Sequence, residues 1–139
     1  APFVDTLFGS LGDVSAIFGI EGESVDAAAE LRERLGVPRV VVSSRVQRAD
    51  GLQLRSSAAV GDYTDVALSP PFHTVDPLGG GDAFCAGFLH GLLGGDQNRA
   101  LELAGATAAL KQSIPGDWAI VSPTEVEEQL SGETVHTRR

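Results

Sequence analysis

The chain has 139 residues, 42% of them apolar and 21% charged, and 19 acidic against 10 basic residues give it a net charge of −9. This length suits one folded domain with its own core, and the composition excludes a disordered tail or a fibrous repeat. The acidic balance argues against nucleic acid or an anionic membrane surface as the main partner, and no apolar run approaches the roughly 20 residues that span a bilayer.

Two features of the composition concern the origin of the chain. It contains no methionine, and it opens in an apolar, strand-like segment at residues 3–8. We therefore expect a piece of a longer protein that lacks its N-terminal portion, with processing of a precursor as the milder alternative. The single cysteine, Cys85, cannot form an internal disulfide, which fits a reducing, cytoplasmic setting.

The first half of the chain alternates short strands and helices. The run Val40, Val41 and Val42 predicts a strand buried on both faces, and Asp50-Gly51 predicts a hairpin turn. In chain order we expect a strand at 3–8, a helix at 13–18, a helix at 25–35 with Ser24 as its N-cap, and strands at 39–43, 52–60, 63–68 and 72–75.

Two apolar helices follow, at residues 82–93 and 99–111. Apolar side chains occupy nearly all sides of the first, which predicts a buried helix. Gly87 and Gly91 lie one turn apart on it. Because they have no side chains, they would let another element approach closely.

The last helix has a clear start signal. Ser122 fits the N-cap position, Pro123 the first helical position and Glu125 the reciprocal position of a capping box. Residues 131–139 read as a polar tail. The complete order of elements predicts an α/β sheet covered by helices.

Three consecutive glycines, Gly79, Gly80 and Gly81, lie between a predicted strand and a predicted helix and precede Asp82. Their backbone N–H groups can close on an anion, and the helix N-terminus adds partial positive charge, as in a phosphate cradle. A carboxylate beside the cradle can accept the proton of an attacking hydroxyl, and it need not be a strong base. The alternative also stands: such glycines often serve only tight packing, and such an aspartate often only caps a helix.

Other motifs are excluded or weak. No Gly-Lys-Ser/Thr follows the glycines, so they are not a Walker loop, and Ala83 and Phe84 break the dinucleotide-binding fingerprint. Cys85 reads as a packing residue on the buried helix. The histidines are too scattered for a metal cage: His73, His90 and His136.

Arg45 and Arg48 form a small basic spot near a predicted strand end. They are either solvated loop charges or phosphate contacts. Because the chain has few other cations, we favour Arg45 for the phosphates of a nucleotide.

The segment 76–89, DPLGGGDAFCAGFL, resembles the signature near the C-terminus of ribokinase-like sugar kinases, usually Asp-Thr-x-Gly-Ala-Gly-Asp-x-Phe. The resemblance covers about residues 3–132. The segment 108–128, AALKQSIPGDWAIVSPTEVEE, and the three glycines 79–81 in place of Gly-Ala-Gly resemble the 2-keto-3-deoxygluconate kinase branch. The segment 43–45 lies where that branch carries a Thr-Leu-Arg-like sequence at the nucleotide site.

The resemblance implies the fold and the chemistry. Residues 1–139 would form the C-terminal, nucleotide-binding portion of a ribokinase-like three-layer α/β/α domain. The activity would be ATP- and Mg²⁺-dependent phosphorylation of a sugar or sugar acid, 2-keto-3-deoxygluconate to its 6-phosphate, in the cytoplasm. The implied site residues are Asp82 as base and substrate contact, Gly79, Gly80 and Gly81 as anion hole, Ser43, Ser44, Arg45, Gly79 and Gly81 toward ATP, and Asp76 and Asp13 toward the metal.

The chain departs from the family pattern at two places. The family's Asn-x-x-Glu motif falls on Ser10 and Asp13, which bears on metal binding, and Pro77 and Leu78 replace the usual Thr and variable residue. Two alternatives therefore remain: a truncated, non-catalytic module that binds nucleotide or a partner, and a kinase for another sugar such as fructose or ribose. A homo-oligomer of the complete protein is left open.

Overall fold

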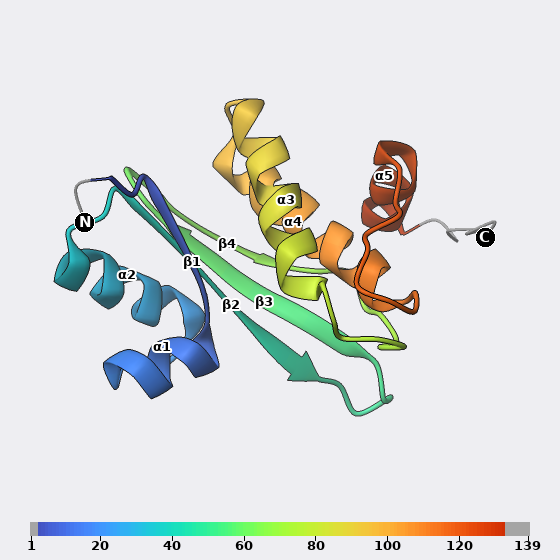
Figure 1. Cartoon of the computed structure of the whole chain (residues 1–139), viewed down its shortest axis with the longest axis horizontal. Helices are drawn as coiled ribbons and strands as arrows, with labels where there is room; N and C mark the ends of the chain where they lie inside the picture. Colours follow the sequence, from blue (N-terminus) through green and yellow to red (C-terminus); the bar gives the residue numbers. More distant parts are fainter. Residues whose placement is uncertain (1–2, 133–139) are drawn as a thin grey trace.

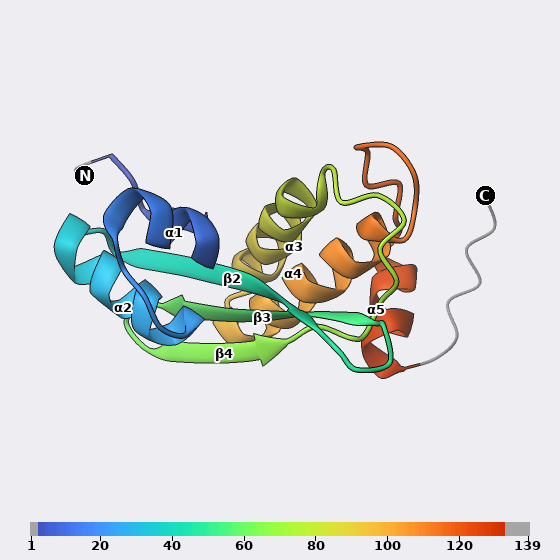
Figure 2. The same ribbon diagram turned by 90° about the horizontal axis from the view of Figure 1, so that it is seen from below.

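The computed structural model describes residues 3–132. A four-stranded sheet forms the middle layer, α1 and α2 cover one face, α3 and α4 cover the other, and α5 packs against α4 (Figures 1 and 2). The α/β sheet covered by helices that the element order predicts is confirmed, as is the three-layer α/β/α arrangement that the family resemblance implies. The elements in chain order are β1 (Thr6–Ser10), α1 (Leu11–Phe18), α2 (Ser24–Leu35), β2 (Arg39–Gln47), β3 (Gln53–Val60), β4 (Thr64–Leu68), α3 (Gly80–Leu93), α4 (Gln97–Gln112) and α5 (Pro123–Ser131).

The sheet has the order β1-β2-β3-β4. β1 runs parallel to β2, while β2 with β3 and β3 with β4 are antiparallel. The predicted hairpin turn at Asp50-Gly51 is confirmed, because it joins β2 to β3. The prediction that β2 ends at Ser43 is wrong: residues 44–47 continue the ladder with β3. Because the turn brings β3 back alongside β2, the polar residues after the valine run are also paired in the sheet.

The valine run of β2 is buried on both faces, as predicted. Val40 and Val42 pack with α2, whereas Val41 packs with α3 and α4. Side chains alternate between the faces of a strand, so residues 41, 43 and 45 share the face toward α3 and α4. This alternation determines which polar residues of β2 can lie near the start of α3.

The first two helices begin differently from the prediction. β1 starts at Thr6 rather than at residue 3, and α1 starts directly after Ser10 rather than at Asp13. Ser10 caps α1, since its hydroxyl accepts the N–H of Asp13 at 3.0 Å. The assignment of Ser24 as the cap of α2 is wrong. Glu23 occupies that position without a side-chain cap bond, and the Ser24 hydroxyl donates instead to Ser44 Oγ at 3.4 Å.

The predicted strand at residues 72–75 does not form. Only one isolated bridge, between Gln53 and Phe72, remains of it. The N–H groups of Val75 and Asp76 instead donate to the Gln112 carbonyl at the end of α4, at 2.7 and 3.1 Å. The segment is therefore attached to a helix end, and this attachment leads the chain into α3.

α3 starts two residues earlier than predicted, at Gly80, and is not buried all round. Leu89 and Leu93 are exposed. The close approach predicted at the two glycines is confirmed: a Cβ on Gly91 would lie 2.5 Å from the Cα of Ala100, and one on Gly87 would lie 2.8 Å from the Leu103 carbonyl oxygen. α3 and α4 therefore pack almost backbone to backbone.

The last two helices are close to prediction. α4 starts at Gln97, two residues before the predicted start, because Asp96 caps it. The capping box of α5, with Ser122 and Glu125, is confirmed. Residues 133–139 of the predicted tail lie outside the described residues. Within the described range, none of the helices is long and apolar enough to cross a bilayer.

Candidate active site

The turn that leads into α3 depends on Gly79. This residue is the N-cap of α3 and has φ +71°, in the left-handed region that favours glycine. A Cβ at this position would lie 2.1 Å from the Asp117 carbonyl oxygen. Gly79 therefore makes both the turn and the close contact with the segment after α4, whereas Gly80 and Gly81 already belong to the helix.

The first turn of α3 offers N–H groups to an anion. The N–H of Gly80 donates to the Pro77 carbonyl at 3.3 Å. In the described part of the chain, the N–H groups of Gly81 and Asp82 have no acceptor. A Cβ on Gly81 would meet nothing within 4 Å, so the space beside this residue is open. Free N–H groups at a helix N-terminus form a site for negative charge.

Asp76 holds the turn in place. Its carboxylate accepts the N–H of Leu78 at 3.0 Å and the N–H of Gly116 at 2.9 Å. These two backbone hydrogen bonds lower the pKa of Asp76 below its ordinary value of 3.8. The ionised carboxylate thus joins the approach to α3 with the loop after α4. Its predicted role toward a metal stays a prediction.

Asp82 follows in the first turn of α3 and is exposed. It lies near Cys85: burial raises the pKa of the Cys85 thiol, and the Asp82 carboxylate adds to that rise. An exposed carboxylate beside free N–H groups can accept a proton from a bound hydroxyl. The assignment of Asp82 as the base stays a prediction.

Two neighbouring hollows lie beside this helix start. One, of about 230 Å³, is lined by Gly81 together with Ser43 of β2 and Asp13 of α1. The other, of about 490 Å³, is lined by Ser43, Ser44 and Arg45, and the two share part of their walls. The structure thus brings five of the predicted site residues to one place. The others, which line neither hollow, are Gly79, Gly80, Asp76 and Asp82.

Arg55, which the sequence reasoning missed, lines both hollows, and so does Ser10, which the sequence analysis named only as the position of the family's Asn. Ser10 donates its hydroxyl hydrogen to the Asp13 carboxylate at 2.6 Å. Arg55 is buried in β3 and lies directly opposite Arg45 of β2. The observed hairpin is centred on Asp50, five residues from each arginine, whereas a two-residue turn at Asp50-Gly51 would pair Arg45 with Ser56.

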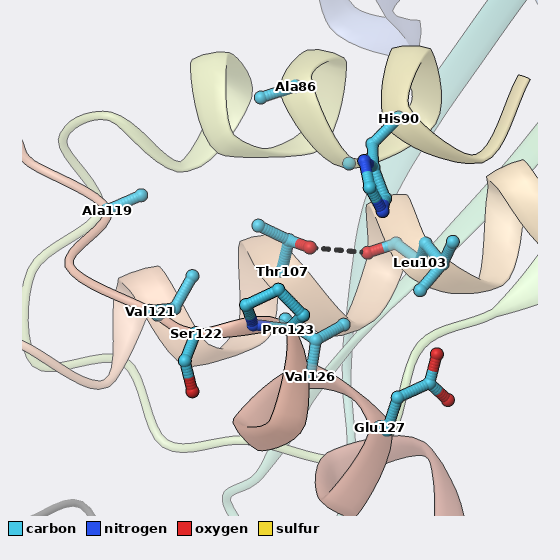
Figure 3. A pocket seen from close by; sticks show the side chains of 11 residues that line it. Ala86, His90, Leu103, Thr107, Ala119, Val121, Ser122, Pro123, Val126 and Glu127 are labelled. Atoms are coloured by element: carbon cyan, nitrogen blue, oxygen red, sulfur yellow. Dashed lines mark hydrogen bonds between the residues drawn. The ribbon is translucent and has the colours of Figure 1, made fainter. Parts of the chain in front are cut away.

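A separate, mostly apolar groove of about 240 Å³ lies between α3, α4 and α5 (Figure 3). His90 and Glu127 lie on its walls, and Thr107 donates its hydroxyl hydrogen to the Leu103 carbonyl at 2.7 Å. None of the predicted site residues lines it. Between residues 3 and 132 there is no cluster of three or more metal-binding side chains.

Comparison with known proteins assigns this arrangement to a family. The model of the pfkB family carbohydrate kinases matches residues 1–122. The 2-dehydro-3-deoxygalactonokinase of Haloferax volcanii is 37% identical over 134 residues, which are 94% of this chain and 39% of that protein. These matches confirm the resemblance to sugar kinases.

Solved structures agree on the fold. The 2-dehydro-3-deoxygluconokinase of Thermotoga maritima superposes with a TM-score of 0.77 at 28% identity, over 93% of this chain and 42% of that one. The ribokinase of Thermotoga maritima gives a TM-score of 0.69 at 24% identity, over 91% and 42%, a likeness of fold alone. The chain therefore spans about two fifths of the length of the relatives it matches.

Proposed function

Because the chain belongs to the pfkB family of carbohydrate kinases, we propose that it carries the phosphoryl-transfer site of an ATP-dependent kinase for a sugar or sugar acid. It would be the C-terminal, nucleotide-binding portion of that enzyme. One observation carries the proposal: α3 begins with the unpaired N–H groups of Gly81 and Asp82, and Gly81 lines a hollow that also contains hydroxyl and guanidinium groups.

The reaction needs few protein groups. Asp82 accepts the proton of the substrate's terminal hydroxyl, whose oxygen bonds to the γ-phosphorus while the bond to the β-phosphate oxygen breaks and ADP leaves. The N–H groups at the start of α3 stabilise the charge on the transferred group. Because phosphoryl transfer depends mostly on positioning and charge stabilisation, a weak base suffices.

The nucleotide's phosphates would lie against the larger hollow as well. Ser43, Ser44 and Arg45 offer hydroxyl and guanidinium donors there. Phosphate groups are well matched by such donors, the guanidinium most strongly. Gly79 contributes by its turn, which orients the start of α3 toward these residues.

The residues present fit a nucleotide-bound Mg²⁺. This ion keeps several waters and needs only one or two carboxylates beside the phosphates, and Asp13 supplies one at the hollow. Asp76 would act on the ion through water, while its oxygens hold the turn. When bound, Mg²⁺ neutralises phosphate charge.

For the substrate we propose 2-keto-3-deoxygluconate, converted to its 6-phosphate. The likeness to the 2-dehydro-3-deoxygluconokinase of Thermotoga maritima supports it. Because the Haloferax relative is named a 2-dehydro-3-deoxygalactonokinase, 2-keto-3-deoxygalactonate is the nearest competing substrate. Fructose and ribose are further candidates. A cytoplasmic enzyme, and a homo-oligomer of the complete protein, both stay predictions.

The second candidate is a nucleotide- or partner-binding module without catalysis. The chain's span of about two fifths of its relatives' length favours it for this chain taken by itself. The two candidates differ in turnover and share nucleotide binding.

The deciding experiment measures Mg-ATP binding by calorimetry and ADP release with the two sugar acids, fructose and ribose. Asp82→Asn should lower turnover about 10²- to 10⁴-fold while ATP binding persists. Asp62→Asn, an exposed carboxylate in the turn between β3 and β4, is the matched control and should change neither quantity.

Each outcome selects one candidate. Turnover that Asp82→Asn removes and Asp62→Asn keeps supports the kinase. ATP binding without turnover on any of the sugars supports the nucleotide-binding module. Turnover that survives Asp82→Asn shows that the base is another group, and a chain that binds no ATP contradicts both nucleotide-dependent readings.

A further inference from the structure

Arg55 is a buried cation in β3, only 9% exposed. Its Nη1 donates to Ser43 Oγ at 3.0 Å, and its guanidinium carbon lies 5.5 Å from the centre of the Phe84 ring. The Nε atom is buried and has no hydrogen-bond acceptor among the described residues. A guanidinium carries five N–H donors, so this side chain leaves most of its donors without a protein acceptor.

No carboxylate within the described range forms an ion pair with Arg55. Asp13 lines the same hollow and Glu21 the neighbouring one, but each accepts a hydroxyl hydrogen bond from a serine nearby in the chain. The residue directly opposite Arg55 on β2 is Arg45. Like charges directly opposite on a sheet destabilise it.

Burial lowers the pKa of Arg55 below its ordinary value, and the charge of Arg45 lowers it further. Both effects express the same cost, that of a buried positive charge without a counter-charge. A neutral side chain of similar size would fill this position at lower cost to the fold. The arginine is therefore better explained by binding than by stability.

We propose that Arg55 binds a phosphate group of the nucleoside triphosphate, together with the hydroxyl of Ser43 and the N–H of Gly81. All three residues line the hollow of about 230 Å³. A guanidinium fork matches phosphate oxygens through paired N–H···O bonds, and the helix start adds further N–H donors. This inference rests on the proposed function, which supplies the phosphate.

A sugar-acid carboxylate shares the oxyanion chemistry and could in principle approach the same guanidinium. The phosphate is favoured because the start of α3, where the unpaired N–H groups lie, lines the same hollow through Gly81. A group with several oxygens can accept from the guanidinium and from these N–H groups at once. The experiment includes both anions as separate probes.

The test compares the wild type with Arg55→Gln, Arg55→Lys and the control Arg48→Gln. Arg48 lies just beyond the end of β2, is exposed, pairs with Asp50 and lines neither hollow. Calorimetry measures the Kd of Mg-ATP, adenosine and 2-keto-3-deoxygluconate. Arg55→Gln should weaken Mg-ATP binding about 10- to 100-fold, the effect of losing hydrogen bonds to a charged group. Adenosine binding should be unchanged, Arg55→Lys should regain part of the affinity, and Arg48→Gln should match the wild type.

A second readout separates binding from structure. Denaturant unfolding of the ligand-free chain should give Arg55→Gln a midpoint equal to or above that of the wild type, because the variant removes an unpaired buried charge. A structural role predicts the opposite. A lowered midpoint with parallel losses of ATP and adenosine binding would overturn the inference.

The remaining outcomes are distinct. Equal Mg-ATP binding by the wild type and Arg55→Gln overturns the role of Arg55 and leaves the proposed function standing. If Arg55→Gln loses only sugar-acid binding, the ligand of Arg55 is the carboxylate of the sugar acid and not a phosphate, and the inference is overturned. A wild type that binds no Mg-ATP overturns the proposed function, and this inference with it.

Discussion

The two helical layers are packed by different means. On the face covered by α1 and α2, the cluster consists mainly of branched aliphatic side chains, among them Val14 of α1, Leu31 of α2 and Ile20 between the two helices. On the other face, half of the buried residues in the cluster under α3 and α4 are alanines, packed around Phe84 and Phe88, and Gly91 brings the helix backbones into contact. The candidate site thus belongs to the layer whose two helices are in close backbone contact, so that neither helix can shift without displacing the other.

This difference has a functional consequence. In the proposed function the N–H groups at the start of α3 act through their position, since a backbone N–H cannot move independently of the helix. Close packing of α3 on α4, and the contacts of Gly79 and Asp76 with the segment after α4, hold that position. A change in this layer should therefore affect stability and binding together, whereas a change under α2 should affect stability alone.

The largest effect is expected for Phe88→Ala. Phe88 is fully buried and meets Phe8 edge to face, with ring centres 5.4 Å apart, and Phe8 lines the smaller hollow. The variant should lose about 3–5 kcal/mol of unfolding free energy and bind Mg-ATP more weakly. Denaturant unfolding and calorimetry measure the two quantities.

Leu31→Ala is the matched change in the other layer. It should cost about 2–5 kcal/mol and leave Mg-ATP binding intact under conditions where the variant is folded. Equal losses of binding in both variants would show that the layers do not differ in their influence on the site.

Gly91→Ala tests the close approach of the helices. Its Cβ would lie 2.5 Å from the Ala100 Cα, a backbone atom that cannot yield without moving α4. We expect a loss of about 1–3 kcal/mol, measured by denaturant unfolding.

The comparison for this variant is Gly81→Ala, where the added Cβ meets open space. It should leave the unfolding free energy unchanged or slightly raised, while Mg-ATP binding weakens because the methyl group enters the proposed phosphate space. Destabilisation by Gly81→Ala instead would contradict the open geometry at the start of α3.

The smallest effect is expected at Asp76, whose carboxylate holds the turn by accepting hydrogen bonds from two backbone N–H groups. Because these bonds lower its pKa below 3.8, its contribution to stability is complete above that value and is lost as the pH falls through the folded-state pKa. Asp76→Asn keeps a hydrogen-bond acceptor but loses the charge. The stability of this variant should therefore fall less than that of the wild type as the pH drops through this range. Unfolding midpoints of both proteins across the acid range test this, and identical profiles would contradict the role of the carboxylate.

Much of the architecture could be predicted from local patterns. The valine run, the Asp50-Gly51 turn and the capping box at Ser122 each involve residues close in the chain, and each was confirmed. The prediction failed where a segment far away in the chain determines the local conformation. Residues 72–75 have strand-like composition, yet their backbone bonds to the end of α4.

The candidate site divides in the same way. Glycine and aspartate at the start of α3 are recognisable because the chemistry of a helix N-terminus is local. Arg55 was missed, because its significance depends on its burial against Phe84 and on the absence of a paired carboxylate in the described structure. Its register with Arg45 depends on the exact length of the loop between β2 and β3, which the Asp50-Gly51 signal does not fix.

The sequence by itself determined the type of each main element, the family and the residues at the start of α3, because periodicity, caps and a short motif are properties of neighbouring residues. The tertiary structure decided which β2 residues meet that helix, and it buried Arg55 of β3 beside them without a paired carboxylate among the described residues. Those properties arise from strand register and from the packing of segments far apart in the chain, where the energy of a side chain depends on what surrounds it.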